Sequence, residues 1–214
     1  MNGVRVVIFA KAPLPGMAKT RLIPTLGAQG AADLARRMLS HTLAQALAAD
    51  VGPVELCVTP SPIETLWQSL AIPASVAWSD QGEGDLGTRM ARVTQRVTGA
   101  GESVLIIGTD CPALDAGHLR RAAASLTHFD ATLVPTADGG YVLLGLNRFH
   151  ASLFVDIEWS THSVASETLS RLEQLGWKVQ NNPMLHDIDE PADLGLLPPA
   201  WLRAANELER ETNR

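Results

Sequence analysis

Short apolar runs alternate with longer segments of helical periodicity along the first 126 residues of the chain. The runs are too short for helices and rich in β-branched residues, which is typical of buried strands. We expect strands at residues 4–9, 54–59, 75–78 and 103–108, and helices at 28–49, at 63–70, from Asp85 as N-cap to about Val97, and from about Asp115. This alternation predicts an α/β fold with a parallel sheet and helices on its faces.

The pattern changes in the second half of the chain. Two apolar runs, 131–135 and 141–146, are joined by the sequence T-A-D-G-G, which predicts an irregular loop that leads into an added strand. A helix at 162–175, a strand at 177–180 and a C-terminal helix at 199–214 complete the prediction. We therefore expect a single domain over residues 1–214, with one half at 1–126 and another at 127–198.

The composition is typical of a soluble globular protein, with 46% hydrophobic and 19% charged residues. A net charge of −6 disfavours a nucleic-acid-binding surface, which needs an excess of Lys and Arg. Cys57 and Cys111 cannot form a disulfide framework, and no window resembles a membrane span or a signal peptide. We expect a cytoplasmic protein that binds neither nucleic acid nor membrane, whose oligomeric state the sequence leaves open.

The loop after the first strand concentrates positive charge in a chain whose net charge is negative. It contains no Walker A motif, because the first glycine of that motif is missing and the lysine spacing is wrong. A strand that runs into such a loop is typical of a site for an anion, although a solvated surface turn would explain the same residues. Its relevant residues are Pro13, Pro15 and Gly16 and the cations Lys11, Lys19 and Arg21.

Four acidic residues in three segments are candidates for chemistry. Asp110 follows the most clearly buried strand, at the edge where open α/β sheets bind ligands, and could hold Mg²⁺ or Mn²⁺; alternatively, it caps the next turn. Asp187 and Asp189 would face one way in an extended segment, but Asp189 precedes Glu190-Pro191 and could instead cap a helix. Asp138 lies in A-D-G-G-Y, which suits either a ligand-contacting loop or a plain turn. The scattered histidines argue against zinc, and no G-x-S-x-G hydrolase motif is present.

Five motifs occur in an order that resembles a bacterial family of small nucleotide-diphospho-sugar transferase-like proteins. They are F-A-K-A-P-L-P-G-M-A-K-T-R-L, G-T-D-C-P, A-D-G-G-Y-V-L-L-G-L, E-W-S-T and D-I-D-E-P-A-D-L, and the resemblance covers roughly residues 4–197. Members of that family are often labelled glycosyltransferases, and some are associated with radical-SAM or arsenosugar gene clusters. The resemblance implies the Rossmann-like GT-A fold, which sugar-phosphate, molybdenum-cofactor and phospholactate nucleotidyltransferases share.

The resemblance also implies roles for individual residues. It implies that residues 1–126 form the nucleotide-binding half. The expected nucleotide contacts are Ala10, Lys11, Gly16, Lys19, Arg21, Asp85 and Asp110. The resemblance makes 127–198 the acceptor-side half, with contacts from Asp138, Gly139, Gly140 and Trp159. Asp110 would bind the divalent cation, but it stands as T-D-C rather than in the D-x-D motif of many glycosyltransferases. We assign the second metal ligand to Asp189 by inference.

Two reactions fit this assignment. In glycosyl transfer, the metal on Asp110 together with Lys19 and Arg21 would stabilise a leaving nucleoside diphosphate, and Asp138 would deprotonate the acceptor, with Asp156 or Glu158 as alternatives. In nucleotidyl transfer, a substrate phosphate would attack a nucleoside triphosphate with release of pyrophosphate, and no base is needed. The Pro-rich loop favours glycosyl transfer. A nucleotide-binding protein without catalytic activity is a third interpretation.

Overall fold

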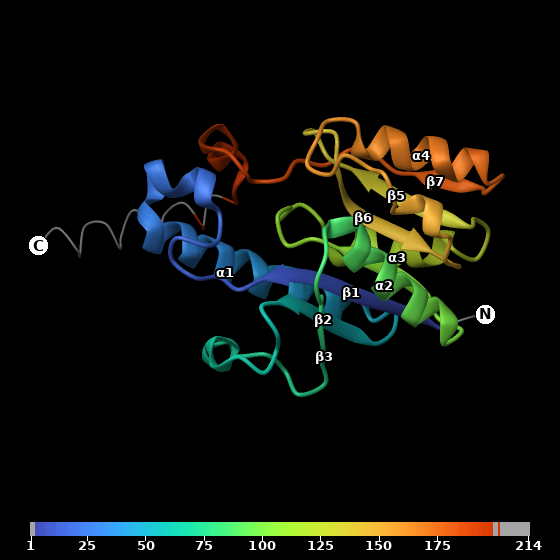
Figure 1. Ribbon diagram of the computed structural model, residues 1–214. Coiled ribbons are helices and arrows are strands. Elements are labelled where there is room, and N and C mark those ends of the chain that lie inside the picture. The colour runs from blue at the N-terminus through green and yellow to red at the C-terminus, as the bar shows by residue number, and fades with distance from the viewer. Residues whose placement is uncertain (1–2, 199–200, 202–214) are drawn as a thin grey trace, which may run out of the picture.

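The computed structural model describes residues 3–198 and residue 201, and its centre is one seven-stranded sheet (Figure 1). The strands lie in the order β3-β2-β1-β4-β6-β5-β7. β6 is antiparallel to its neighbours β4 and β5, whereas all other pairs are parallel. The sheet comprises β1 Val4–Lys11, β2 Val54–Thr59, β3 Ala77–Asp80, β4 Ser103–Ile107, β5 Ala131–Pro135, β6 Tyr141–Leu146 and β7 Val179–Asn181.

Four helices cover the two faces of this sheet. They are α1 Ile23–Ala49, α2 Leu86–Gly99, α3 Ala116–Ser125 and α4 Val164–Gln174. Successive strand residues point to opposite faces: Val6 and Ile8 pack with side chains of α1 and α3, whereas Val7 packs with side chains of α2 and α4. The predicted mostly parallel α/β sheet with helices on both faces is thereby confirmed. No helix among the described residues is long and apolar enough to cross a membrane.

Several predicted boundaries need correction. The segment predicted as a helix at 63–70 forms only a short 3-10 turn, Thr65–Ser69, and the strand predicted at 75–78 lies at Ala77–Asp80. The prediction that Asp189 caps a helix is wrong, because Glu190 caps the 3-10 helix Pro191–Leu196. The predicted helix at 199–214 lies outside the described residues, apart from residue 201.

The strand order creates a topological switch point between β1 and β4. The chain runs outward from β1 through β2 to β3 and then returns to place β4 on the other side of β1. At such a point the connections leave the carboxyl ends of neighbouring strands in opposite directions, so a crevice opens between them. The loops after Lys11 and Ile107 meet there.

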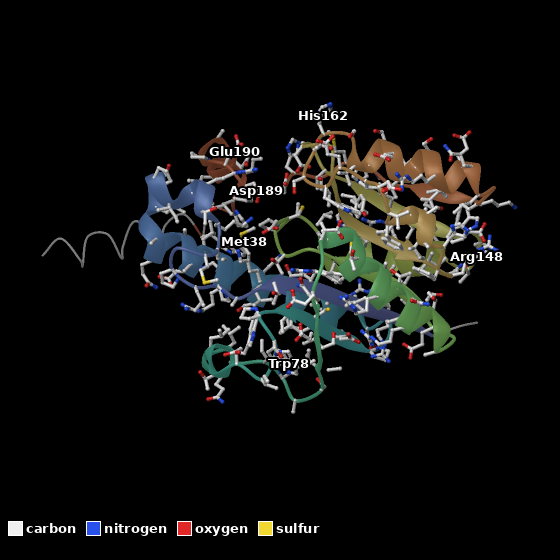
Figure 2. All side chains as sticks on the ribbon, viewed as in Figure 1. Met38, Trp78, Arg148, His162, Asp189 and Glu190 are labelled. Carbon is white, nitrogen blue, oxygen red and sulfur yellow. The ribbon has the colours of Figure 1, made fainter. Side chains whose placement is uncertain are left out.

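The C-terminal segment closes one end of this crevice. Ile188 and Leu197 pack with Leu22 and Met38 in a small separate core. Figure 2 labels Met38 on α1, and Asp189 and Glu190 on the C-terminal segment that packs beside it. The Ile188 N–H donates to the Asp110 carbonyl oxygen at 2.8 Å, so backbone pairing fixes this segment against the loop after β4. A segment near the C-terminus is thereby held at the carboxyl edge of the central strands.

Candidate active site

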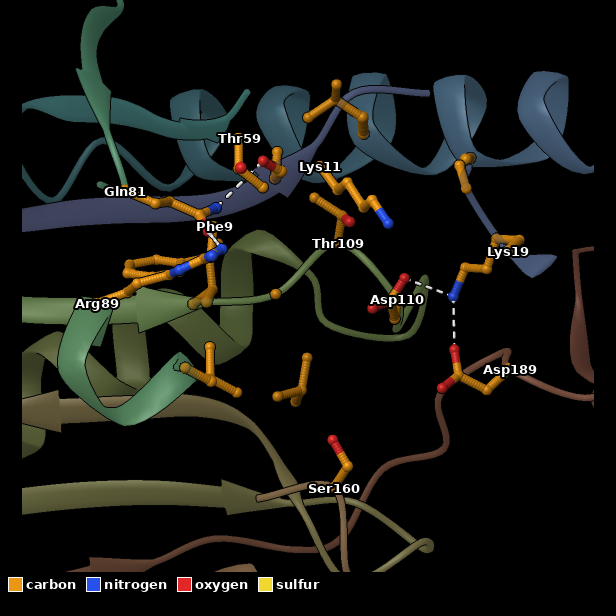
Figure 3. A pocket seen from close by; sticks show the side chains of 18 of the residues that line it. Phe9, Lys11, Lys19, Thr59, Gln81, Arg89, Thr109, Asp110, Ser160 and Asp189 are labelled. Atoms are coloured by element: carbon orange, nitrogen blue, oxygen red, sulfur yellow. Dashed lines mark hydrogen bonds and ion pairs between the residues drawn. The ribbon is translucent and has the colours of Figure 1, made fainter. Parts of the chain in front are cut away.

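A cavity of about 710 Å³ occupies the crevice at the carboxyl ends of β1 and β4 (Figure 3). This volume suits a nucleotide-sized ligand. Its walls come from the end of β1, the first loop, α1, the start of α2, the end of β4 and the segment around Asp189. The basic side chains that line the cavity are those of Lys11, Lys19, Arg21 and Arg89.

Lys19 joins two carboxylates from distant parts of the chain. Its Nζ lies 2.5 Å from Asp110 Oδ1 and 2.7 Å from Asp189 Oδ1, and it also donates to the Ile188 carbonyl oxygen at 2.7 Å. An ammonium group has three N–H donors, so these three oxygens use all of them. The side chain is only 7% exposed. Burial lowers the pKa of Lys19, but attraction to Asp110 and Asp189 outweighs it, and the pKa of Lys19 is raised overall.

The backbone at Lys19 is held in an unusual conformation. Its φ of 47° and ψ of 46° are left-handed, which costs a non-glycine residue on the order of 1 kcal/mol. The Leu22 N–H donates to the Lys19 carbonyl oxygen at 2.9 Å, which closes the turn into α1. The first loop is therefore shaped to direct this ammonium group toward Asp110 and Asp189.

The donor set around Lys19 partly fits a divalent cation. Two carboxylates and a carbonyl oxygen meet at one point, and hard oxygen donors are what Mg²⁺ and Mn²⁺ prefer. The described residues contain no group of three His, Cys, Asp or Glu side chains that could hold a metal ion. A Mg²⁺ ion commonly binds one or two carboxylates and completes its shell with water and substrate phosphate. Asp110 and Asp189 fit such a site but do not form a complete protein cage.

A second lobe of about 220 Å³ adjoins the first and shares Asp110 and Asp189 with its lining. Four carboxylates line it, those of Asp110, Asp138, Asp187 and Asp189. None of the described residues that line this lobe is Lys, Arg or His. The cavity as a whole is therefore basic at one end and acidic at the other.

Local pairing positions the acids of the second lobe. A parallel bridge between Thr136 and Leu185 brings Asp187 beside Asp138. Asp138 Oδ1 accepts hydrogen bonds from Thr136 Oγ1 at 2.6 Å and from the Gly140 N–H at 2.9 Å. The pKa of Asp187 is raised to about 6, mainly by burial and secondly by repulsion from Asp138.

Gln81 and Arg89 also line the cavity, and neither is among the site residues predicted from the sequence. Gln81 Nε2 donates to the carbonyl oxygens of Ala10 at 3.2 Å and Cys57 at 3.0 Å. Its Oε1 accepts from Arg89 Nη1 at 3.2 Å. Gln81 therefore ties the ends of β1 and β2 to α2 and fixes the backbone of Ala10. The Gly-rich loop that contains Gln81 is the sequence feature from which these two residues could have been predicted.

A family model described as an uncharacterized protein conserved in bacteria (DUF2064) matches residues 42–161. The chain belongs to the DUF2064 family. No curated protein matches it in sequence. Among solved structures, it is similar to a provisionally named nucleotide-diphospho-sugar transferase from Desulfovibrio desulfuricans G20, with 28% identity, a TM-score of 0.88, and 99% of this chain and 98% of the other covered. The resemblance seen in the motifs is thereby confirmed.

Two more distant structures share the fold. Rv0371c from Mycobacterium tuberculosis H37Rv, in complex with manganese, has 16% identity and a TM-score of 0.52, with 92% of this chain and 98% of the other covered. The synthetase for CMP-2-keto-3-deoxy-manno-octonic acid, complexed with CTP, has 11% identity and a TM-score of 0.56, with 96% and 100% covered. These similarities support the predicted GT-A type fold.

Most of the predicted site residues line the cavity of this DUF2064 protein. The first lobe includes Ala10, Lys11, Lys19, Arg21, Asp110 and Asp189, and the second includes Asp138, Gly140 and Trp159. All three donors of Lys19 are used within the protein, and its predicted contact with phosphate stays a prediction.

Three predicted site residues, Gly16, Asp85 and Gly139, are not among those that line either lobe. The Asp85 carboxylate instead caps α2 by accepting from the Thr88 N–H at 2.8 Å. Gly139 has a φ of 90°, and a Cβ there would lie 2.0 Å from the His162 carbonyl oxygen, so its role is to let two loops pack. The alternative bases Asp156 and Glu158 also lie outside the lining of both lobes.

Proposed function

We propose that this DUF2064 protein is a metal-dependent glycosyltransferase that uses a nucleotide-diphosphate sugar donor. The observation that carries the proposal is the division of charge between two adjoining lobes that share Asp110 and Asp189 in their lining. The basic lobe suits a diphosphate, and the acidic lobe suits an acceptor that carries hydroxyl groups and no negative charge. The name of the similar Desulfovibrio protein supports the same class of reaction.

The donor would occupy the first lobe. Lys11 and Arg21 line it and are exposed, and Arg21 makes only a 3.9 Å contact with Asp189. Cations in these positions can pair with phosphate oxygens and stabilise the charge that develops on a leaving nucleoside diphosphate. A divalent cation on Asp110 and Asp189 would neutralise the same diphosphate from the opposite side.

The acceptor would enter the second lobe beside Asp138. One oxygen of Asp138 is held by two hydrogen bonds, so the side chain is fixed. Its other oxygen has no hydrogen-bond partner within the described residues and is available to accept a proton from an acceptor hydroxyl. Trp159 lines the same lobe and provides an apolar surface of the kind on which sugar rings and similar groups pack.

Nucleotidyl transfer is the second candidate, because the fold also occurs in a synthetase complexed with CTP and in a nucleotidyl transferase from Methanothermobacter. That reaction needs a phosphate or another anionic nucleophile beside the donor. Asp138 and Asp187 line the second lobe, and neither forms an ion pair with a described residue, so these two carboxylates would repel such a group. This charge distribution favours glycosyl transfer.

The product that leaves the donor distinguishes the two reactions. Purified protein should be incubated with Mn²⁺ and a panel of nucleotide sugars, and separately with nucleoside triphosphates, while nucleoside diphosphate and pyrophosphate are measured. We expect nucleoside diphosphate from a nucleotide sugar. Pyrophosphate release from a triphosphate would refute glycosyl transfer and favour the second candidate.

A matched pair of variants tests the proposed base. Asp138→Asn should lower kcat on the order of 100-fold or more, because general base catalysis typically contributes a factor of that size. Glu173→Gln removes an exposed carboxylate from α4, outside the lining of both lobes, and should leave kcat unchanged. Equal activity of the two variants would exclude Asp138 as the base.

A further inference from the structure

Lys19 occupies the point at which a divalent cation would be bound. Its ammonium group lies between Asp110 Oδ1 and Asp189 Oδ1, the two carboxylates that fit the metal, and its third donor is taken by the Ile188 carbonyl oxygen (Figure 3). A metal ion and an ammonium group on the same pair of oxygens would repel each other strongly at this distance. Lys19 and the metal therefore compete for the same oxygens.

The two carboxylates do not depend on Lys19 for their proximity. The Ile188 N–H donates to the Asp110 carbonyl oxygen at 2.8 Å, so the segments that carry the two acids are paired through their backbones. Asp110 is 50% exposed and Asp189 is 38% exposed, so water can reach both carboxylates when Lys19 is elsewhere. The site can remain assembled after the ammonium group has left.

We propose that Lys19 is a displaceable internal counter-ion, which neutralises Asp110 and Asp189 in the absence of metal and leaves them when the divalent cation binds. The proposal rests on the metal dependence of the proposed function. The released ammonium group then lies in the basic lobe, where the diphosphate of the donor provides new oxygen acceptors. Lys19 is thus a positioning residue before metal binding and a phosphate ligand after it.

A permanent structural clamp is the rival interpretation of the same contacts. If Lys19 never leaves, its removal should destabilise the fold without improving metal binding. If Lys19 is displaced, its removal should improve metal binding, because the ion no longer has to expel a cation. The affinity for Mn²⁺ in the absence of nucleotide therefore separates the two interpretations.

The first experiment measures that affinity for two matched variants. Lys19→Met and Lys11→Met each remove one positive charge from the same cavity, but no ion pair joins Lys11 to another described residue. Free Mn²⁺ can be followed by electron paramagnetic resonance during titration of each full-length protein. We expect Lys19→Met to bind Mn²⁺ on the order of tenfold more tightly than the wild type, and Lys11→Met to change the affinity by about threefold or less.

The second experiment uses the wild-type protein and so does not depend on how a variant folds. The chain contains three lysines, Lys11, Lys19 and Lys178, so amine acylation at each can be measured by mass spectrometry. Lys19 is buried and paired and should react slowly without metal. Saturation with Mn²⁺ should increase its labelling several-fold, while labelling of Lys11 and Lys178 should stay constant.

Two results would overturn the proposal. One is that Lys19→Met binds Mn²⁺ no more tightly than Lys11→Met does. Absence of Mn²⁺ binding by both variants counts as this result. The other is saturation of the wild type by Mn²⁺ with unchanged labelling of Lys19. Neither measurement uses a donor or an acceptor. A failed assay for glycosyl transfer would therefore not contradict the displacement of Lys19, and failure of the displacement proposal would not contradict glycosyl transfer.

Discussion

Asp187 should destabilise the folded protein at neutral pH, and its replacement by Asn should therefore be stabilising. The side chain is half-buried among Asp138, Asp189 and Asp110, and its pKa is raised from 3.8 to about 6, mainly by burial. A raised carboxyl pKa means that the folded state binds a proton more tightly than the unfolded state. The free energy of unfolding therefore falls as the pH rises from about 4 to about 6 and stays lower above that range.

The size of the effect follows from the shift. A difference of about 2 pKa units corresponds to about 3 kcal/mol, and screening by solvent at this partly exposed site reduces that to about 1–2 kcal/mol. Asp187→Asn keeps the shape of the side chain and removes the charge. We expect its Tm to exceed that of the wild type by about 3–6 °C at pH 8 and to equal it near pH 4.

Thermal unfolding of the wild type and the variant between pH 4 and pH 8, without divalent cations, measures this difference. Glu158→Gln is the control, because that carboxylate is exposed and forms no hydrogen bond or ion pair with its side chain among the described residues. A stability difference that is independent of pH, or a variant less stable than the wild type at pH 8, would refute the assigned electrostatic cause.

Three further predictions concern single substitutions. Asp110→Asn should weaken Mn²⁺ binding at least tenfold and lower kcat on the order of 100-fold, measured by titration and turnover; unchanged metal dependence would remove Asp110 from the metal site. Glu55→Gln should cost about 2–4 kcal/mol in urea unfolding, because Glu55 is 3% exposed and pairs with Arg96; a loss below about 1 kcal/mol would contradict this. Gly139→Ala should lower the free energy of unfolding by about 2–4 kcal/mol, because the new Cβ would clash with backbone and φ is 90°. Gly101→Ala should lower it by only about 1 kcal/mol, because φ is 82° there but the new Cβ would point into open space.

Local signals in the sequence predicted most of the secondary structure. The strand predicted at 54–59 is β2 without a change of boundary, and Asp85 caps α2 as expected, because both depend on neighbouring residues. The segment at 63–70 was predicted wrongly as a helix. Trp67 is buried in the core and Leu66 and Leu70 pack against it, but Ile63 is 86% exposed, so core contacts hold only part of the segment and do not support a regular helix over its whole length.

The acidic residues of the site could be identified from their positions after strands and beside glycines, but their partners could not. Lys19 and Asp189 are 170 residues apart in the chain, and their 2.7 Å contact arises because the C-terminal segment pairs with the loop after β4. Gln81 went unrecognised for the same reason: its hydrogen bonds reach two other strands, and only the strand order brings those strands together.

The sequence by itself determined which segments form strands and helices, since periodicity and capping act over a few residues, and it supplied the cations and acids of the site. Only the tertiary structure decided how these charges are used. It placed antiparallel β6 between β4 and β5, gathered four carboxylates in one lobe and directed Lys19 toward two of them. Charges act through space over several ångströms, so their effect depends on distances that the order of residues along the chain does not specify.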